Sequence, residues 1–303
     1  MSLRKTLWIP ILQKKLLPLN DFLKESVDET AFIDGEQVVR SIEGDQPEVL
    51  LDSRGAVSAT NLEDTPNAYP MHNLRTRTSL IEDIEEIELA YDKRASLIDR
   101  HASQLNLKGV NFMAYKWSAT RQDNIIRTTG GNTEATTMGA TGTRKSMTID
   151  DFNKACLLLD DMDVDPENGR NCLIPAAWYR DLLMQNEREL LDLAKYGKAV
   201  MENGVLLSLL GVRIWRRGKK NLPRYSAAQL PVPLSPFSVV LKDDNACANF
   251  WHKDAVGSAM GGQFMYATPT AEAQGWHISA RIRAGGSPIY PDQTGVVSVV
   301  ETA

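Results

Sequence analysis

The chain has 303 residues, of which 43% are hydrophobic and 24% charged, with 20 glycines and 14 prolines. This composition indicates a globular protein with a substantial core and excludes collagen-like, coiled-coil-only and strongly disordered chains. The three cysteines, Cys156, Cys172 and Cys247, are far apart and form no CxxC pair, which argues against a disulfide framework or a zinc knuckle. No apolar run approaches the ~18 residues that a membrane-spanning helix needs.

The net charge of -5 is unevenly distributed. Residues 1–25 carry +3, residues 26–90 carry -11 and residues 91–303 carry +3. Such segregation is typical of segments that meet an oppositely charged partner, and another copy of the same chain qualifies as that partner. An ordinary solvated acidic face is the alternative, and composition alone does not decide between them.

The first 78 residues predict two extended elements. Residues 7–22 alternate apolar clusters with prolines, so residues 1–35 are expected to form an arm. Residues 35–77 have glycine and proline breaks around two short β-prone runs, 37–42 and 48–51, which predicts a long hairpin. The hairpin has too few apolar residues for a core of its own, so it must pack on something else.

A long helix is predicted next. Ser79 and Glu82 match the S-x-x-E capping box, and apolar residues follow at three- and four-residue steps as far as Leu105. The pattern predicts a helix over about residues 80–106, roughly 40 Å long at 1.5 Å per residue. This length suits a structural strut.

The remainder mixes helices and strands. Residues 128–147 are rich in glycine and threonine and are interpreted as a loop between two packed parts. Thr148 is expected to cap a helix, and another helix is expected after Pro175. Predicted strands lie at 170–174, 211–215, 238–241, 276–282 and 296–300. No βαβ rhythm is present, so the predicted fold class is α+β.

The sequence offers no convincing catalytic, cofactor-binding or metal-binding residue. Gly139, Gly142, Lys145 and Ser146 resemble a phosphate-binding loop, but two residues separate the second glycine from the lysine. A nucleotide-using enzyme working through residues 139–146 is kept as an alternative. The Gly-x-Ser-x-Gly spacing of a nucleophile elbow is not met at 257–261. The four histidines are isolated, and none forms the His-x-x-x-His pair that binds zinc.

Residues 213–224 contain six basic side chains around Gly218. The composition suits a phosphate-contacting patch, but the central glycine suggests a hairpin turn. A solvated turn that meets an acidic neighbour is favoured over nucleic-acid binding, because no binding motif accompanies it.

The order of these features carries a family resemblance: arm, acidic hairpin, long helix, glycine-threonine linker, mixed domain and terminal strands. The matching motifs are WIP at 8–10, LPLNDFL at 17–23, YDKR at 91–94, RKSMT at 144–148, LLDDMDV at 158–164, GRNCLIP at 169–175, FWHKDAV at 250–256 and IYPDQTGVV at 289–297. The chain resembles the major capsid proteins of tailed bacteriophages, whose Hong Kong 97-type shell fold is shared with encapsulin compartments.

The resemblance implies a domain plan and a function without catalysis or cofactors. The domains implied are an arm (1–35), an extended loop (36–78), a spine helix with the first part of a peripheral domain (79–147), a mainly axial domain (148–255) and peripheral return strands (256–303). The chain would self-assemble through pentamers and hexamers into an icosahedral shell around double-stranded DNA. An encapsulin-type compartment is the alternative with the same fold.

The same resemblance implies partners and a location. The partners would be other copies of the chain, a portal, scaffolding or decoration proteins, and packaged DNA held by non-specific contacts, with no membrane involved. The location would be the virion capsid, and the host cytoplasm during assembly. The residues expected at contacts between subunits are Trp8, Leu12, Leu16, Phe22, Glu63, Asp64, Arg216, Arg217, Lys219 and Lys220.

Some members of this family join their subunits covalently, through a lysine of the extended loop and an asparagine of a neighbour. Between Lys24 and Lys93 this chain has only arginines as basic residues. A guanidinium stays protonated near neutral pH and does not replace the amine as a nucleophile. We therefore expect shells without such cross-links.

Overall fold

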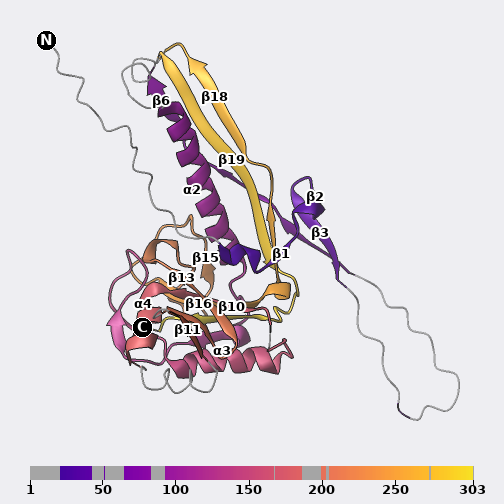
Figure 1. The fold of residues 1–303 in the computed structure, drawn as a ribbon, viewed down its shortest axis with the longest axis vertical. Helices are drawn as coiled ribbons and strands as arrows, with labels where there is room; N and C mark the ends of the chain where they lie inside the picture. The colour runs from indigo at the N-terminus through magenta and orange to yellow at the C-terminus, as the bar shows by residue number, and fades with distance from the viewer. Residues whose placement is uncertain are drawn as a thin grey trace.

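The computed structural model describes residues 21–42, 51, 65–82, 93–166, 168–185, 199–202, 205–272 and 274–302. Figure 1 shows an elongated upper part, in which a long helix lies along a long strand, above a compact lower part that contains a sheet and shorter helices. A strand hairpin projects from one side of the junction between these parts. The mixture of elements confirms the predicted α+β class.

The elongated part is built on strand β19 (Gly275–Pro288). Within the described residues β19 belongs to a six-stranded sheet with β1 (Val27–Asp28), β17 (Val256–Met260), β18 (Phe264–Thr270), β5 (His72–Arg75) and β6 (Ser79–Glu82). Helix α2 (Lys93–Lys116) packs along β19 through apolar side chains that include Leu105, Val110 and Met113. Strand β1 is the parallel partner of β17, and the other pairings are antiparallel.

The predicted start of the long helix is wrong. Ser79 and Glu82 lie in β6, where Ile81 is buried and Leu80 is exposed, the two-residue alternation of a strand. The backbone of β6 pairs with β19 from Gly275 to Ile278, so Ser79 caps no helix. The predicted helical positions 84–92 lie outside the described residues. The helix runs ten residues further than expected, to Lys116, because buried apolar side chains continue to its end.

The lower part contains a nine-stranded sheet, counted over the described ranges. Its path runs β11 (Ala199–Glu202), β12 (Val205–Leu209), β13 (Val212–Arg217), β10 (Arg170–Pro175), β16 (Asn245–His252), β14 (Arg224–Tyr225) and β15 (Pro233–Leu234). Strand β20 (Val296–Val300) pairs with β16 and with β7 (Ile125–Arg127). Helices α3 (Ile149–Asp161) and α4 (Ala176–Gln185) contribute to the core of this part, where Phe152, Trp178 and Phe250 are fully buried.

Most of the predicted elements of the lower part are confirmed. Strands β10, β13 and β20 and, in the upper part, β19 contain the four predicted runs 170–174, 211–215, 296–300 and 276–282 almost entirely. Thr148 caps α3: its hydroxyl accepts from the Asp151 N–H at 3.1 Å, and the Asp151 carboxylate accepts from the Thr148 N–H at 3.2 Å. The predicted strand at 238–241 is wrong, because these residues form an exposed loop, and the fully buried run that follows from Asn245 is the strand.

The glycine- and threonine-rich segment 128–147 is not the expected linker. It folds into a short hairpin of β8 (Asn132–Glu134) and β9 (Thr143–Lys145). Several of its side chains are buried, and the Thr136 hydroxyl accepts a hydrogen bond of 3.0 Å from the Trp178 indole N–H. Buried threonine hydroxyls with partners take the place of large apolar groups here, which sequence periodicity does not register.

The structure also divides the expected return segment 256–303. Strands β17, β18 and β19 belong to the upper sheet, whereas β20 crosses back into the lower sheet between β16 and β7. The chain therefore passes between the two parts more often than the implied domain plan assumes. The domain boundaries 148–255 and 256–303 stay a prediction, and the structure shows only to which sheet each strand belongs.

A buried histidine connects α2 to the strands beneath it. His101 lies on α2 with its Nδ1 atom 2.7 Å from the Thr76 hydroxyl and its Nε2 atom 3.1 Å from the Ser79 hydroxyl. The Thr76 hydroxyl also accepts from the Ala280 N–H of β19 at 2.9 Å. Burial lowers the pKa of His101 below its usual value, because the charged ring loses water.

We expect the stability of the subunit to fall as the pH is lowered. The unfolded chain binds a proton on His101 near its ordinary pKa of about 6.5, and the folded chain binds it only at lower pH. Stability is therefore fully present above the unfolded pKa and is lost as the pH falls toward the folded pKa. Denaturant unfolding of the wild-type chain and of His101→Gln at several pH values tests this. An unchanged pH slope in the variant would contradict the assignment, since His72, whose pKa burial and Lys116 also lower, would then carry the dependence.

Candidate assembly surfaces

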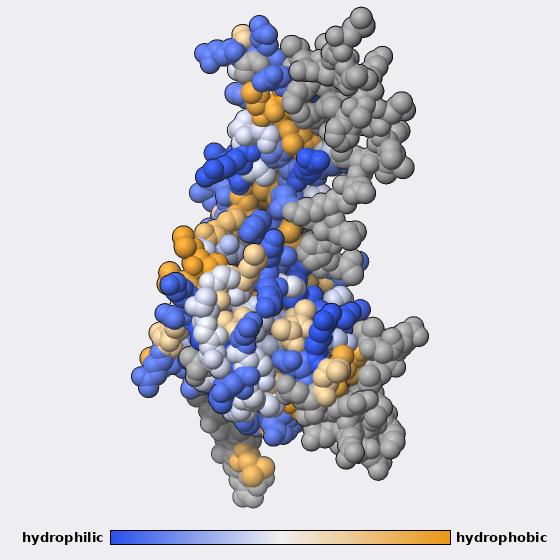
Figure 2. Space-filling model, turned by 90° about the vertical axis from the view of Figure 1, so that its left-hand side faces the viewer, coloured by the Kyte–Doolittle hydropathy of each residue, from blue (hydrophilic) through white to orange (hydrophobic). Residues whose placement is uncertain are grey.

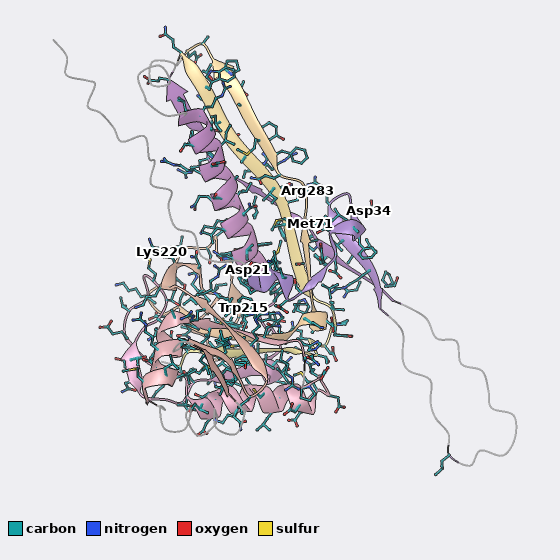
Figure 3. The ribbon with its side chains drawn as sticks, viewed as in Figure 1. Asp21, Asp34, Met71, Trp215, Lys220 and Arg283 are labelled. Atoms are coloured by element: carbon teal, nitrogen blue, oxygen red, sulfur yellow. The ribbon has the colours of Figure 1, made fainter. Side chains whose placement is uncertain are left out.

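The described residues offer little that resembles an active site. Among them, no three His, Cys, Asp or Glu side chains lie close enough to hold a metal ion, and no helix is long and apolar enough to cross a membrane. The three cysteines are free thiols buried in the core, and burial raises the pKa of the Cys156 thiol to about 12. Figure 3 shows Asp34 on the projecting hairpin and Lys220 on the other side of the molecule, near the top of the lower part.

The projecting hairpin is the first candidate. Strand β3 (Gln37–Ile42) pairs antiparallel with β4 (Thr65–Pro70), and β2 (Ile33–Asp34) pairs with the other edge of β3. These bounds confirm the predicted strand 37–42, and the second predicted run lies outside the described residues except for Leu51, which is exposed. Val38 is fully buried whereas its neighbour Val39 is 37% exposed. One face of the hairpin therefore packs against the rest of the chain, and the other face is exposed to solvent.

A buried polar network holds the base of the hairpin. The Glu29 carboxylate, 4% exposed, accepts from the Arg40 guanidinium at 3.0 Å and from the Tyr69 hydroxyl at 2.7 Å. The guanidinium also donates to the backbone carbonyls of Pro288 and Ile289 at the end of β19. A small apolar cluster of Val38, Tyr69, Met71 and Ala259 accompanies it. Sequence reasoning missed Glu29 and Arg40, because Tyr69 lies 40 positions from Glu29 and the Pro288 carbonyl lies 248 positions from Arg40.

Half of the predicted contact residues lie outside the described part of the chain. These are Trp8, Leu12 and Leu16 of the arm and Glu63 and Asp64 of the extended loop. Their role in contacts between subunits stays a prediction.

The prediction for Phe22 needs correction. The side chain is 1% exposed, and its ring centroid lies 6.2 Å from those of Trp117 and Trp251 of the same chain. Its apolar surface is already covered, so it does not anchor the arm on a neighbour. Residues 21–34, which lie within the expected arm 1–35, pack against the rest of the subunit, and β1 forms an edge of the upper sheet.

The prediction for Arg217 is wrong for the same reason. Its guanidinium lies 4.9 Å from the Phe22 ring centroid, the residue is 1% exposed, and burial lowers its pKa to about 10. Arg217 is therefore a buried cation that packs against Phe22 within the subunit. The basic segment 213–224 is accordingly not one solvated turn: Arg213 pairs with Glu25 at 2.8 Å, and Arg224 is buried against Asp244 at 2.6 Å.

Three of the predicted cations are exposed. Arg216 lies near the end of β13, and its guanidinium carbon is 4.7 Å from the centroid of the Tyr179 ring. Lys219 and Lys220 lie in the short 3-10 helix η4 (Lys219–Asn221). The space-filling view in Figure 2 shows hydrophilic residues along much of one face of the molecule, with smaller apolar patches between them. These cations are available to an acidic partner.

The phosphate-loop alternative finds no support in the geometry. Lys145 lies in β9, and the buried Arg144 of the same strand donates to the Asn245 side chain at 2.9 Å. The N-terminus of α3, where a phosphate would bind, already holds the Asp151 carboxylate. Burial alone would raise the pKa of Asp151, but hydrogen bonds from Thr129 and Thr148 outweigh it and the pKa is lowered. The site is occupied by an anion of the chain itself.

Comparison with known proteins identifies the fold of this chain. No protein-family model matches the sequence, and no curated protein matches it. The capsid of cyanophage P-SCSP1u is similar over 96% of this chain and 91% of its own, with 18% identity and a TM-score of 0.66. The capsid of Ralstonia phage GP4 is similar over 98% of this chain and 94% of its own, with 12% identity and a TM-score of 0.66. The chain has the fold of the tailed-phage capsid proteins.

This capsid fold accounts for nearly the whole chain. The head structure of Helicobacter pylori bacteriophage KHP40 adds a third match, over 96% of this chain and 94% of its own, with 12% identity and a TM-score of 0.64. Because coverage is nearly complete in both directions, the likeness extends over the long helix, both sheets and the projecting hairpin together. The capsid fold expected from the order of sequence motifs is therefore confirmed.

Proposed function

We propose that this chain is the major capsid subunit of a bacteriophage, which assembles through pentamers and hexamers into an icosahedral shell around double-stranded DNA. The observation that carries the proposal is the full-length likeness to subunits of phage capsids. The role is structural. The upper and lower parts would be the peripheral and axial domains, and the projecting hairpin would be the extended loop.

The hairpin supports this proposal on physical grounds. Its open face carries the half-exposed Val39, and Phe32 beside it is 61% exposed, while the hairpin core consists of a few side chains at its base. A two-stranded element of this kind is marginal alone and gains stability by lying on another surface. Contacts between different patches of identical subunits generate closed rings when the rotation closes, and five- and six-fold rings build a shell.

Contacts between subunits are expected to involve opposite charges. The exposed Arg216, Lys219 and Lys220 are suited to the acidic stretch 26–90 of a neighbour, and the arm would add the apolar side chains Trp8, Leu12 and Leu16. A portal, scaffolding or decoration proteins and packaged DNA are further proposed partners. The virion capsid is the proposed location.

Electron microscopy of the purified full-length chain tests the proposal. We expect closed shells, tubes or rings of capsomers, and a dispersed monomer under all assembly conditions would contradict it. The content of shells purified from infected cells separates the two functions of this fold: double-stranded DNA supports a capsid, whereas an enclosed enzyme supports a protein compartment.

We predict that mature shells contain no covalent links between subunits. No lysine occurs between Lys24 and Lys93, so the extended loop has no amine to attack a neighbouring side chain. Particles boiled in detergent and reductant should give one band near 33.7 kDa on a denaturing gel. A ladder of multimers would refute this.

A further inference from the structure

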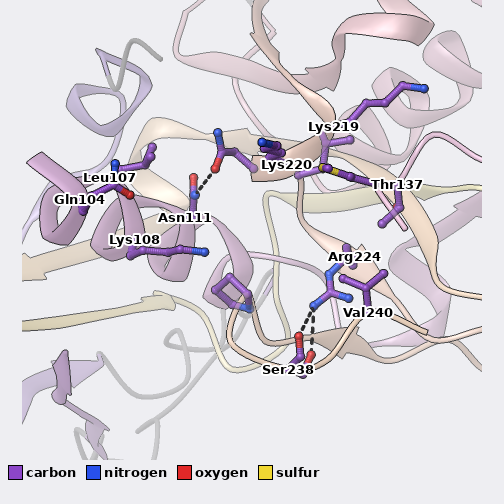
Figure 4. Close-up of a pocket in the computed structure, with 14 residues that line it drawn as sticks. Gln104, Leu107, Lys108, Asn111, Thr137, Lys219, Lys220, Arg224, Ser238 and Val240 are labelled. Atoms are coloured by element: carbon purple, nitrogen blue, oxygen red, sulfur yellow. Dashed lines mark hydrogen bonds between the residues drawn. The ribbon is translucent and has the colours of Figure 1, made fainter. Parts of the chain in front are cut away.

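A hollow of about 490 Å³ separates the second half of α2 from the lower part of the molecule. We call it the α2 hollow. Its walls come from α2, from the turn at Thr137 and Met138, from η4 and from the loop 236–240, as Figure 4 shows. Its location between the two parts makes it a concave surface on which both parts contribute side chains.

The α2 hollow is strongly cationic. Lys108, Lys219 and Lys220 line it together with Arg224, and no aspartate or glutamate of the described residues does. The Arg224 charge is matched by the buried Asp244 carboxylate, at 2.6 Å. No carboxylate of the described residues forms an ion pair with any of the three lysines. Within the described part of the chain the three lysines are thus available to an external anion, and Lys108 also lies 5.9 Å from the Phe237 ring centroid.

Two buried polar atoms on the wall lack a hydrogen-bond partner. They are Oδ1 of Asn111 and Oγ1 of Thr137, and both residues are 5% exposed or less. The Asn111 amide group already donates to the Asn221 side chain at 3.0 Å, so its oxygen requires a donor. A buried acceptor without a donor costs about 1–3 kcal/mol. Both atoms are covered by the wall, so an occupant with N–H or O–H groups supplies the missing donors only once a shift of the wall side chains exposes them.

The hollow also presents apolar surface. Met138 is 51% exposed and Val240 is 38% exposed, and both line it. An occupant with only charged groups would leave this surface in water. An acidic peptide supplies all three kinds of group: carboxylates for the lysines, N–H donors for Asn111 and apolar side chains for Met138. The backbone of duplex DNA offers hydrogen-bond acceptors only, and the duplex is too wide to enter the hollow.

We propose that the α2 hollow binds residues 43–64 of another copy of this chain. This segment has six acidic residues and one basic residue, and it contains Val49, Leu50, Leu51, Val57 and Leu62. Strands β3 and β4, which carry it, lead away from α2, so the occupant belongs to a different copy (Figure 1). The assignment rests on the proposed self-assembly and identifies the surface that receives the extended loop.

Cross-linking tests the assignment directly. Shells are assembled from a mixture of ordinary and ¹⁵N-labelled chains and treated with a water-soluble carbodiimide, which joins a lysine amine to a nearby carboxylate. Mass spectrometry should find Lys108, Lys219 or Lys220 linked to an acidic residue of 43–64, with mixed labels that prove a link between chains. Links from these lysines to other segments only, or protection of the lysines by packaged DNA, would overturn the assignment.

Charge exchange gives a second test. Lys219→Glu with Lys220→Glu, and separately Glu63→Lys with Asp64→Lys, should each raise the concentration needed for assembly about tenfold, as expected for two or three partly exposed ion pairs. Combining all four substitutions should restore assembly. Lys242→Glu is the matched control, an exposed lysine on the neighbouring loop that does not line the hollow, and should have little effect.

The outcomes separate this inference from the proposed function. A wild-type chain that never self-associates overturns both. Shells that form normally in the Lys219→Glu, Lys220→Glu variant, or a fourfold variant no better than either pair, overturn the docking assignment and leave the capsid function standing. Circular dichroism of each unassembled variant identifies any that fail to fold, and Lys219→Gln with Lys220→Gln then replaces the reversed pair.

Discussion

Replacing Arg224 with methionine is expected to lower the free energy of unfolding by about 3–5 kcal/mol, as for other buried ion pairs that lose one partner. The guanidinium donates to the Asp244 carboxylate at 2.6 Å and to the backbone carbonyls of Ser235 and Ser238 at 3.0 Å. The two side chains are 7% and 2% exposed. Methionine would leave the Asp244 carboxylate buried without its counter-charge, and denaturant unfolding of the unassembled subunit measures the loss.

The double variant Arg224→Met, Asp244→Leu should recover much of this loss, because both buried charges are then absent. Arg213→Met is the control: Arg213 pairs with Glu25 at 2.8 Å, but its side chain is 58% exposed, so the expected loss is below about 1 kcal/mol. Equal losses in Arg224→Met and Arg213→Met would show that burial of the pair does not determine its contribution.

Replacing Phe22 with alanine is expected to cost about 3–5 kcal/mol, the usual range for a buried phenylalanine. The ring packs edge-on against Trp117 at 6.2 Å between centroids and supports the buried Arg217. Phe32→Ala, ten positions further along the same segment, removes a ring that is 61% exposed. It should change the free energy of unfolding by about 0.5 kcal/mol or less.

Truncation extends this prediction to the arm. Deleting residues 1–20 leaves Phe22 and β1 in place, and we expect a folded subunit that assembles poorly. Deleting residues 1–34 removes both of them and the buried Glu29, and we expect it to abolish folding. Circular dichroism and light scattering distinguish the two. A stably folded product of the longer deletion would refute the assignment of residues 21–34 to the core.

The sequence predicted an element correctly where its local pattern agrees with the contacts that the element makes in the folded chain. The β-prone run 37–42 between turn residues predicted β3 with correct bounds, and Thr148 predicted the cap of α3, because both signals depend on neighbours within a few residues. The order of motifs along the whole chain predicted the fold, although no single motif is specific.

The errors have a common physical cause, which is contact over long sequence distances. Ser79 and Glu82 satisfy a capping pattern, but pairing with Gly275–Ile278 makes this segment a strand. Arg217 belongs to a basic run that is typical of a surface, yet Phe22, about 195 positions earlier in the chain, covers it. The α2 hollow was equally invisible, since Lys108, Thr137 and Lys219 come together only in three dimensions.

The network at the base of the hairpin sets an order of events during synthesis. Glu29 and Arg40 are made early, but the groups that hold them, including the Ser258 carbonyl that accepts from the Glu29 N–H at 2.8 Å and the Pro288 carbonyl, leave the ribosome near the end of translation. Loop closure over more than 200 residues is slow. We therefore expect the base of the hairpin to stay unanchored in a nascent chain until the segments around Ser258 and Pro288 have been made.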